Sequence, residues 1–119
     1  MVRTAMRAVT FAWTGFVASA PGLADVAVEQ GRAVYDQTCA VCHGPDGAGG
    51  MPGVPDFNDP AGPLSKPDAV LLKSTIEGST SPGSPMAMPP KGGNPALTES
   101  EIMAVLAYIR SRFGAAQRK

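Results

Sequence analysis

The chain is poor in the residues that usually build a hydrophobic core or a metal site. Its 119 residues include one Trp, two Tyr, four Phe, two Cys and a single His. Acidic and basic side chains balance at ten each, so no excess of positive charge favours nucleic acid. No segment alternates apolar and polar residues as a strand does. A small domain so short of bulky side chains ordinarily needs a disulfide, a metal or a cofactor.

The first 24 residues have the pattern of a cleaved secretory signal. Two arginines precede an uncharged run at residues 8–20. Gly22 and Ala24 are small residues at the third and first positions before a cleavage site, which predicts that the mature chain begins at Asp25. The uncharged run is shorter than the ~20 residues that span a bilayer. We therefore predict export to the periplasm, with no membrane span left after cleavage.

The predicted mature domain, residues 25–119, is slightly acidic and has few aromatic residues. Without the two leader arginines its net charge is −2, from eight basic and ten acidic side chains. This charge again disfavours nucleic acid as a partner. The aromatic residues that remain are Tyr35, Phe57, Tyr108 and Phe113. A bulky component of the core is therefore expected to come from outside the polypeptide.

The domain is predicted to be all-α, with three main helices separated by long loops. The first helix is expected over residues 26–40, with Asp25 as its N-cap. Pro67 in the first turn and Gly78 at the stop delimit a short second helix. Residues 41–64 are too rich in proline and glycine for a helix or a central strand. A loop of that length in a small domain usually has a function.

The last helix has the clearest signals. Thr98 and Glu101 form a capping box, and Leu97 and Ile102 are spaced to act as a hydrophobic staple. An apolar stripe then recurs at helical spacing. Its members are Ile102, Val105, Leu106, Ile109 and Phe113.

Both cysteines and the only histidine lie in the stretch QTCAVCHG. A structural zinc site needs four ligands, and this chain has three Cys or His residues in total. A structural disulfide would suit an exported protein but leaves His43 unexplained. A thioredoxin-like redox pair normally follows a strand, and no strand is recognisable before Cys39. A catalytic cysteine needs an acidic or amide partner beside its histidine, and none is recognisable here.

The remaining interpretation is covalent haem, for which Cys-x-x-Cys-His is the attachment signature. Thioethers from Cys39 and Cys42 on one helical turn would reach the two vinyl groups of a porphyrin. His43, directly after Cys42, would deliver an imidazole nitrogen to the iron from the same side. One haem c fits the export signal and supplies the missing bulk of the core.

These features resemble the class I c-type cytochromes, especially small bacterial periplasmic monohaem cytochromes similar to cytochrome c5. The resemblance covers residues 25 to about 113. Its first part begins at Gly31 and runs through the stretch YDQTCAVCHG, which looks like the family's first helix and haem site. It implies the cytochrome c fold, in which Gly31 and Tyr35 pack against Val105 and Tyr108 of the last helix. A glycine inside a helix is otherwise poorly tolerated unless another backbone approaches closely.

The second axial ligand is expected to be a methionine, because the mature chain has no other histidine. The candidates are Met51, Met86, Met88 and Met103. Met51 is too near His43 to reach the opposite haem face, and Met103 belongs to the last helix. Between the other two, the resemblance of AMPPKGG to the family's ligand loop favours Met88.

The resemblance also implies roles for two residues that follow the haem motif. In the family, a proline carbonyl about a dozen residues downstream accepts a hydrogen bond from the axial histidine. Pro55 has that offset here, and Pro52 is the alternative. Phe57 is expected to face the porphyrin.

Two axial protein ligands leave iron no open position, so we predict a single-electron carrier between periplasmic redox proteins and not an enzyme. Three alternatives remain. The chain could be a haem-bearing subunit of a larger oxidoreductase, or a haem enzyme or sensor in which Met88 dissociates. It could also be a copper-handling protein that binds Cu(I) through Met86 and Met88.

Overall fold

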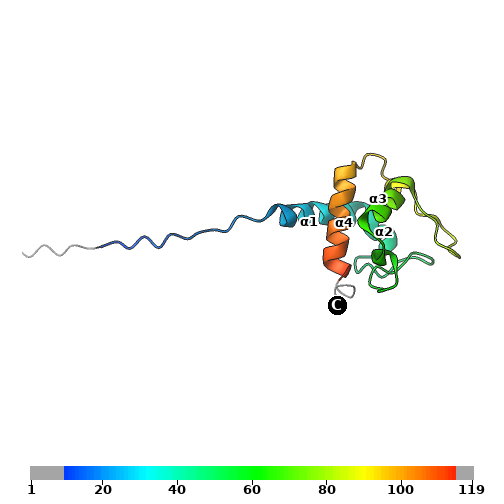
Figure 1. Ribbon diagram of the computed structural model, residues 1–119, viewed down its shortest axis with the longest axis horizontal. Helices are drawn as coiled ribbons and strands as arrows, with labels where there is room; N and C mark the ends of the chain where they lie inside the picture. The colour runs from blue at the N-terminus through cyan, green and yellow to red at the C-terminus, as the bar shows by residue number, and fades with distance from the viewer. Residues whose placement is uncertain (1–9, 115–119) are drawn as a thin grey trace, which may run out of the picture.

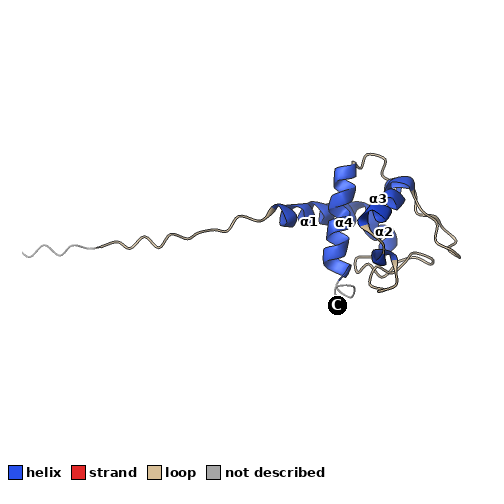
Figure 2. Cartoon of the chain, viewed as in Figure 1, coloured by secondary structure: helices blue, strands red, loops and turns tan. Residues whose placement is uncertain are grey.

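Helices are the only extended regular elements among residues 10–114, the part of the chain that the computed structural model describes (Figures 1 and 2). No β-strand forms there, and the nearest approach to one is an isolated antiparallel bridge between Ser79 and Met88. The predicted all-α class is confirmed. The main helices are α1 (Leu23–Val34), α3 (Asp68–Glu77) and α4 (Glu99–Phe113), and α2 is a single turn at Ala40–His43.

The start of α1 differs from the prediction. Gly22, and not Asp25, is the N-cap, and Asp25 is the third helical residue. The carboxylate of Asp25 accepts a hydrogen bond of 3.2 Å from the amide of Gly22. An acidic residue in the first turn also interacts favourably with the unpaired amides there. The predicted cleavage site therefore falls inside the first turn of α1.

The segment before α1 does not pack against the helices. Residues 10–22 form no helix and extend away from it (Figure 1), and all of their side chains are exposed. Trp13 and Phe16 are 94% and 95% exposed. The two leader arginines lie outside the described residues.

The crossing of α1 and α4 depends on a glycine. A Cβ atom at Gly31 would lie 1.9 Å from the carbonyl oxygen of Ala104 and 2.9 Å from the Cβ of Tyr108. No side chain fits in that space, so the two backbones meet there directly. The expectation that Gly31 packs against the last helix is confirmed, with Ala104 as the nearest neighbour.

The core lies along α4. Thr98 and Glu101 form the expected capping box, with reciprocal hydrogen bonds of 3.2 and 2.8 Å. All members of the predicted apolar stripe are buried. Tyr35 is fully buried, and its ring lies 5.4 Å from Tyr108 and 5.5 Å from Phe113.

α3 is joined to α4 through Arg110. Pro67 is the N-cap of α3, one position earlier than expected, and Gly78 ends the helix at φ +82° as expected. The guanidinium of Arg110 donates to the carbonyls of Leu64 and Lys66, at 2.9 and 2.6 Å, and pairs with the carboxylate of Asp68. One side chain of α4 thus fixes the segment that leads into α3.

Among the described residues, no helix combines the length and the apolar character required to cross a membrane.

Candidate functional site

The cysteine–histidine segment lies at the end of a helical path that changes its winding at Tyr35. α1 continues into a π-helical turn at Tyr35–Cys39 and then into α2 at Ala40–His43. In the π turn, the amide of Ala40 donates to the carbonyl of Tyr35, five residues back. π turns are rare and concentrate at functional sites. Nothing in the residue pattern predicted this change of winding.

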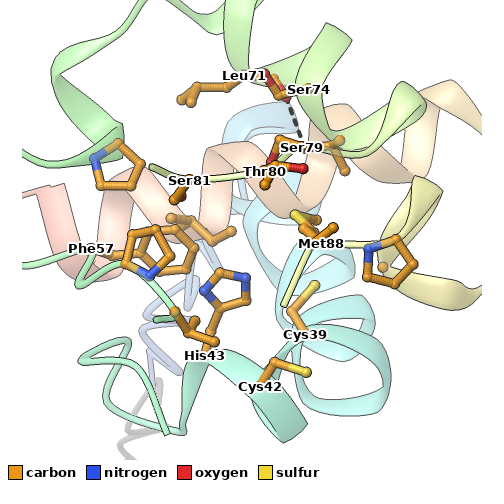
Figure 3. Close-up of a pocket in the computed structure, with 18 of the residues that line it drawn as sticks. Cys39, Cys42, His43, Phe57, Leu71, Ser74, Ser79, Thr80, Ser81 and Met88 are labelled. Carbon is orange, nitrogen blue, oxygen red and sulfur yellow. Dashed lines mark hydrogen bonds between the residues drawn. The ribbon is translucent and has the colours of Figure 1, made fainter. Parts of the chain in front are cut away.

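One cavity, with a volume of about 260 Å³, brings together the side chains that the sequence identified. Cys39, Cys42 and His43 face it from the helical path, and Met88 faces it from the loop between α3 and α4 (Figure 3). Much of the remaining wall is apolar. The larger aliphatic members of that wall are Val54, Leu64, Leu71, Val105, Leu106 and Ile109.

His43 is held by stacking and not by a hydrogen bond. Its ring lies face to face with Phe57, with centroids 4.5 Å apart and planes within 14°. Its Nδ1 atom is buried and has no hydrogen-bond partner. Burial lowers the pKa of His43, so the neutral imidazole, which has a free lone pair, is favoured.

The resemblance gave Pro55 the role of hydrogen-bond acceptor for His43 and placed Phe57 against the porphyrin. The hydrogen bond from His43 Nδ1 to the carbonyl of Pro55, or of Pro52, does not form in the structure. Pro55 and Phe57 both line the cavity. Phe57 stacks on the imidazole and also on Phe113, and the ring centroids of Phe57 and Phe113 are 6.0 Å apart. The imidazole is stacked on Phe57, and its Nδ1 atom has no hydrogen-bond partner.

Cys39 and Cys42 are half-buried and form no disulfide with each other. Burial raises the pKa of the Cys39 thiol to about 11. The thiol therefore stays protonated at neutral pH, unlike that of a nucleophilic cysteine, whose pKa is depressed. Within residues 10–114, no three Cys, His, Asp or Glu side chains are grouped to hold a metal ion.

Met88 is placed by hydrogen bonds of its own backbone. Its amide donates to the carbonyl of Ser79 at 2.7 Å, and the amide of Ser79 donates to the carbonyl of Met88 at 3.1 Å. A Cβ at Gly78 would lie 2.8 Å from the Met88 carbonyl oxygen, so the end of α3 also packs against this residue. Met86 lines the cavity too but is 44% exposed. Met51 and Met103 are not part of the lining.

A group of hydroxyl side chains on the cavity wall was missed by the sequence analysis. Figure 3 shows Ser74, Ser79, Thr80 and Ser81 on the side of the cavity away from His43. Hydroxyls can donate hydrogen bonds to carboxylates. The density of Ser and Thr in residues 74–81 is the signal that could have identified them.

These residues fit a covalently attached haem. Two unpaired thiols, a neutral imidazole and a thioether converge on a largely apolar space. A buried imidazole nitrogen without a hydrogen bond is unusual in a folded protein. The ring is oriented by its stack with Phe57, and Nε2 is the nitrogen that would be available to an iron centre.

Comparison with known proteins gives a consistent result. The family described as "Cytochrome C oxidase, cbb3-type, subunit III" matches residues 26–109. Cytochrome c-555 of Chlorobaculum thiosulfatiphilum is 37% identical over 82 residues, which are 66% of this chain and 88% of that protein. Cytochrome c-555 of Prosthecochloris aestuarii is 33% identical over 84 residues, 66% of this chain and 81% of that protein.

A longer relative is the cbb3-type cytochrome c oxidase subunit FixP of a Bradyrhizobium species. It is 32% identical over 105 residues, which are 83% of this chain but only 35% of that protein. The all-helical fold, the Cys-x-x-Cys-His segment at the cavity and these matches agree with one another. The chain therefore belongs to the c-type cytochromes, in the family of cbb3-type oxidase subunit III, and is an electron-carrying protein of the kind that holds haem c covalently.

Proposed function

We propose that the chain is a periplasmic single-electron carrier with one six-coordinate haem c. Cys39 and Cys42 form the thioether bonds, His43 is the proximal ligand and Met88 is the distal ligand. The observation that carries this proposal is that all four side chains line the same cavity. When bound, haem supplies an iron centre that accepts and returns one electron.

The choice of Met88 is supported by how its loop is fixed. A ligand must be held where its sulfur can stay on the metal, and the Ser79–Met88 bridge gives Met88 such a position. Met86 has no comparable pair of backbone hydrogen bonds and is more open to solvent. A thioether ligand favours the reduced state of iron and raises the reduction potential relative to a second imidazole.

The other residues of the cavity would orient His43 and exclude water. Phe57 holds the imidazole plane through its stack with the ring. Leu64, Leu71 and Ile109 provide apolar walls. Such walls disfavour the extra charge of the oxidised centre, so they act in the same direction as the thioether.

Export is supported by the leader pattern and by the exposure of the segment before α1. The apolar side chains of residues 10–22 are exposed and contact no core; the proposed cleavage would also remove Gly22 and the first two residues of α1, so that the helix would begin at Asp25. We propose that residues 1–24 are removed and that the mature domain, residues 25–119, acts in the periplasm. Its redox partners are expected to be proteins of the same compartment.

Intact mass and optical spectra of the protein matured in a haem-ligating host test these assignments together. We expect the mass of a chain that begins at Asp25 and carries one haem. A pyridine haemochrome spectrum should be that of haem bound through two thioethers. A mass without haem would contradict the proposal and would favour the copper-binding alternative.

Paired methionine variants test the distal ligand. Met88→Ala should abolish the weak long-wavelength band of thioether-bound ferric haem and allow carbon monoxide to bind the ferrous form. Its reduction potential should fall by a tenth or more of the about 0.8 V range that axial ligands span. Met86→Ala is the matched control and should retain the band. The reverse result would assign the ligand to Met86.

A second candidate function is that of an electron-transfer subunit of an oxidase. The observations that favour it are the oxidase-subunit family match over residues 26–109 and the likeness to part of FixP. Size-exclusion chromatography of a native periplasmic or membrane extract separates the two functions. A free carrier elutes at the size of the mature domain, whereas a subunit elutes with a larger complex.

A further inference from the structure

Two loops approach the cavity and touch each other. The histidine loop, residues 44–57, follows α2, and the methionine loop, residues 79–89, follows α3. Gly53 of the histidine loop lies against Ser84 and Pro85 of the methionine loop. The contact therefore joins the segment after the proximal histidine to the segment that carries both candidate methionine ligands.

The contact is too close for any side chain at position 53. A Cβ atom there would lie 2.5 Å from Ser84 Oγ, 2.7 Å from Pro85 Cδ and 3.1 Å from Ser84 Cα. The proline ring and the Cα atom belong to the backbone or are fixed to it, so they cannot rotate away. A methyl group at Gly53 would therefore have to move the two loops apart.

Ser84 transmits this contact toward the methionines. Its hydroxyl donates to the carbonyl of Met86 at 2.7 Å and accepts from the amide of Met86 at 3.3 Å. Turning the hydroxyl away from Gly53 would break both bonds. At its base, the same loop is fixed by the Ser79–Met88 bridge. The methionine loop is thus closed at its base by the Ser79–Met88 bridge and contacted at its outer part by Gly53.

We propose that Gly53 is a positioning residue for the distal ligand. Because Gly53 has no side chain, the histidine loop and the methionine loop can contact each other directly. This contact keeps the Met86–Met88 segment against the cavity, and small molecules are then excluded from the site opposite His43. This inference rests on the proposed ligation by His43 and Met88. It assigns Gly53 a role through the loop and not through contact with the iron.

A pair of glycine variants separates loop contact from backbone strain. Gly53 has φ +81° and Gly83, in the methionine loop, has φ +76°. Alanine is strained at both positions, but at Gly83 nothing lies within 4 Å of the added methyl group. Gly83→Ala is therefore the matched control for Gly53→Ala. Both are compared with wild type as haem-loaded proteins.

The probe is imidazole, titrated into the ferric protein and followed by absorbance. An external ligand binds only molecules in which the distal site is open, so its apparent affinity reports the open fraction. We expect Gly53→Ala to bind imidazole about tenfold more tightly than Gly83→Ala or wild type. The long-wavelength thioether band should weaken in Gly53→Ala and stay unchanged in Gly83→Ala.

Equal imidazole affinities for the two alanine variants would overturn the inference. If Gly53→Ala yields no haem-loaded protein, Ser84→Ala decides instead, because it removes both hydrogen bonds to Met86 without adding an atom. It should also bind imidazole more tightly than wild type, and an unchanged affinity would overturn the inference. If wild type lacks the thioether band, the proposed ligation itself is wrong. If wild type has the band and neither variant changes, the ligation stands and only the role of Gly53 fails.

Discussion

The hydroxyl of Tyr35 shows how one buried polar group supports the site. It donates a 2.6 Å hydrogen bond to the carbonyl of Gly44, the residue directly after His43. The Gly44 carbonyl also accepts a 3.2 Å bond from the amide of Gly47. Tyr35 thus ties the end of the cysteine–histidine segment to the crossing of α1 and α4.

Tyr35→Phe should therefore destabilise the protein at neutral pH by about 1 kcal/mol, the net value of one hydrogen bond whose acceptor keeps another donor. Urea denaturation of the haem-loaded protein measures this difference. The fold should be retained, because the ring keeps its contacts with Tyr108 and Phe113. A loss above about 3 kcal/mol would mean that the hydroxyl has a larger role than this bond.

The same variant should change the pH dependence of stability. Burial raises the pKa of Tyr35 far above the ordinary tyrosine value of about 10. Above about pH 10 the unfolded chain releases the phenol proton while the folded chain keeps it, so the free energy of unfolding falls as the pH rises further. Tyr35→Phe has no such proton and should lose stability less steeply in this range. Parallel profiles for the two proteins would contradict the burial effect.

At the scale of the elements, the crossing of α1 and α4 makes a sharper prediction. In an exposed helix, Gly→Ala stabilises by roughly 0.5–1 kcal/mol. At Gly31 the added methyl group would overlap the carbonyl of Ala104. Gly31→Ala should therefore destabilise by about 2–3 kcal/mol, since two packed backbones must separate. Thermal unfolding measures the change, and the exposed neighbour Gln30→Ala, expected to be nearly neutral, is the control.

The elements also show which parts of the structure the sequence could predict. α4 was predicted closely because its capping box and apolar stripe are local signals that agree with each other. α1 begins earlier than predicted because Asp25 is compatible both with an N-cap and with the first turn, and only the preceding backbone distinguishes them. The π turn at Tyr35–Cys39 has no residue signature in the sequence, and it contacts α4, which is distant along the chain.

The site was predictable to the extent that it is local. Cys39, Cys42 and His43 were identified because their spacing is itself the motif. The choice of Met88 over Met86 needed the family's loop pattern. The Gly53 contact with Ser84 and Pro85 could not be predicted, because it depends on the paths of two loops that lack regular structure.

At the scale of the whole molecule, Arg110 joins three segments. It reaches the carbonyls of Leu64 and Lys66 and the carboxylate of Asp68, so it links α4 to the segment before α3 and to the first turn of α3. Arg110→Lys should destabilise by about 2 kcal/mol, because an ammonium group cannot satisfy this spread of acceptors. Thermal unfolding of the haem-loaded protein measures the loss.

Arg112→Lys is the matched control for Arg110→Lys. The guanidinium of Arg112 lies 5.8 Å from the centroid of the Phe113 ring, at the exposed end of α4. A lysine can make a similar contact with an aromatic face, so this variant should change stability by less than about 0.5 kcal/mol. A loss below about 0.5 kcal/mol for Arg110→Lys as well would show that Arg110 acts only as a surface charge, because lysine keeps that charge.

Because the walls of the cavity are apolar, the resistance of the polypeptide to proteolysis should depend on the supply of haem. Before haem is attached, the apolar side chains that line the cavity have little to pack against. The folded and unfolded forms of the chain then differ little in free energy. Degradation of such a chain follows the population of its unfolded form. Cells that export this polypeptide while starved of porphyrin should therefore digest it, and its abundance should follow haem synthesis even when its transcript is constant.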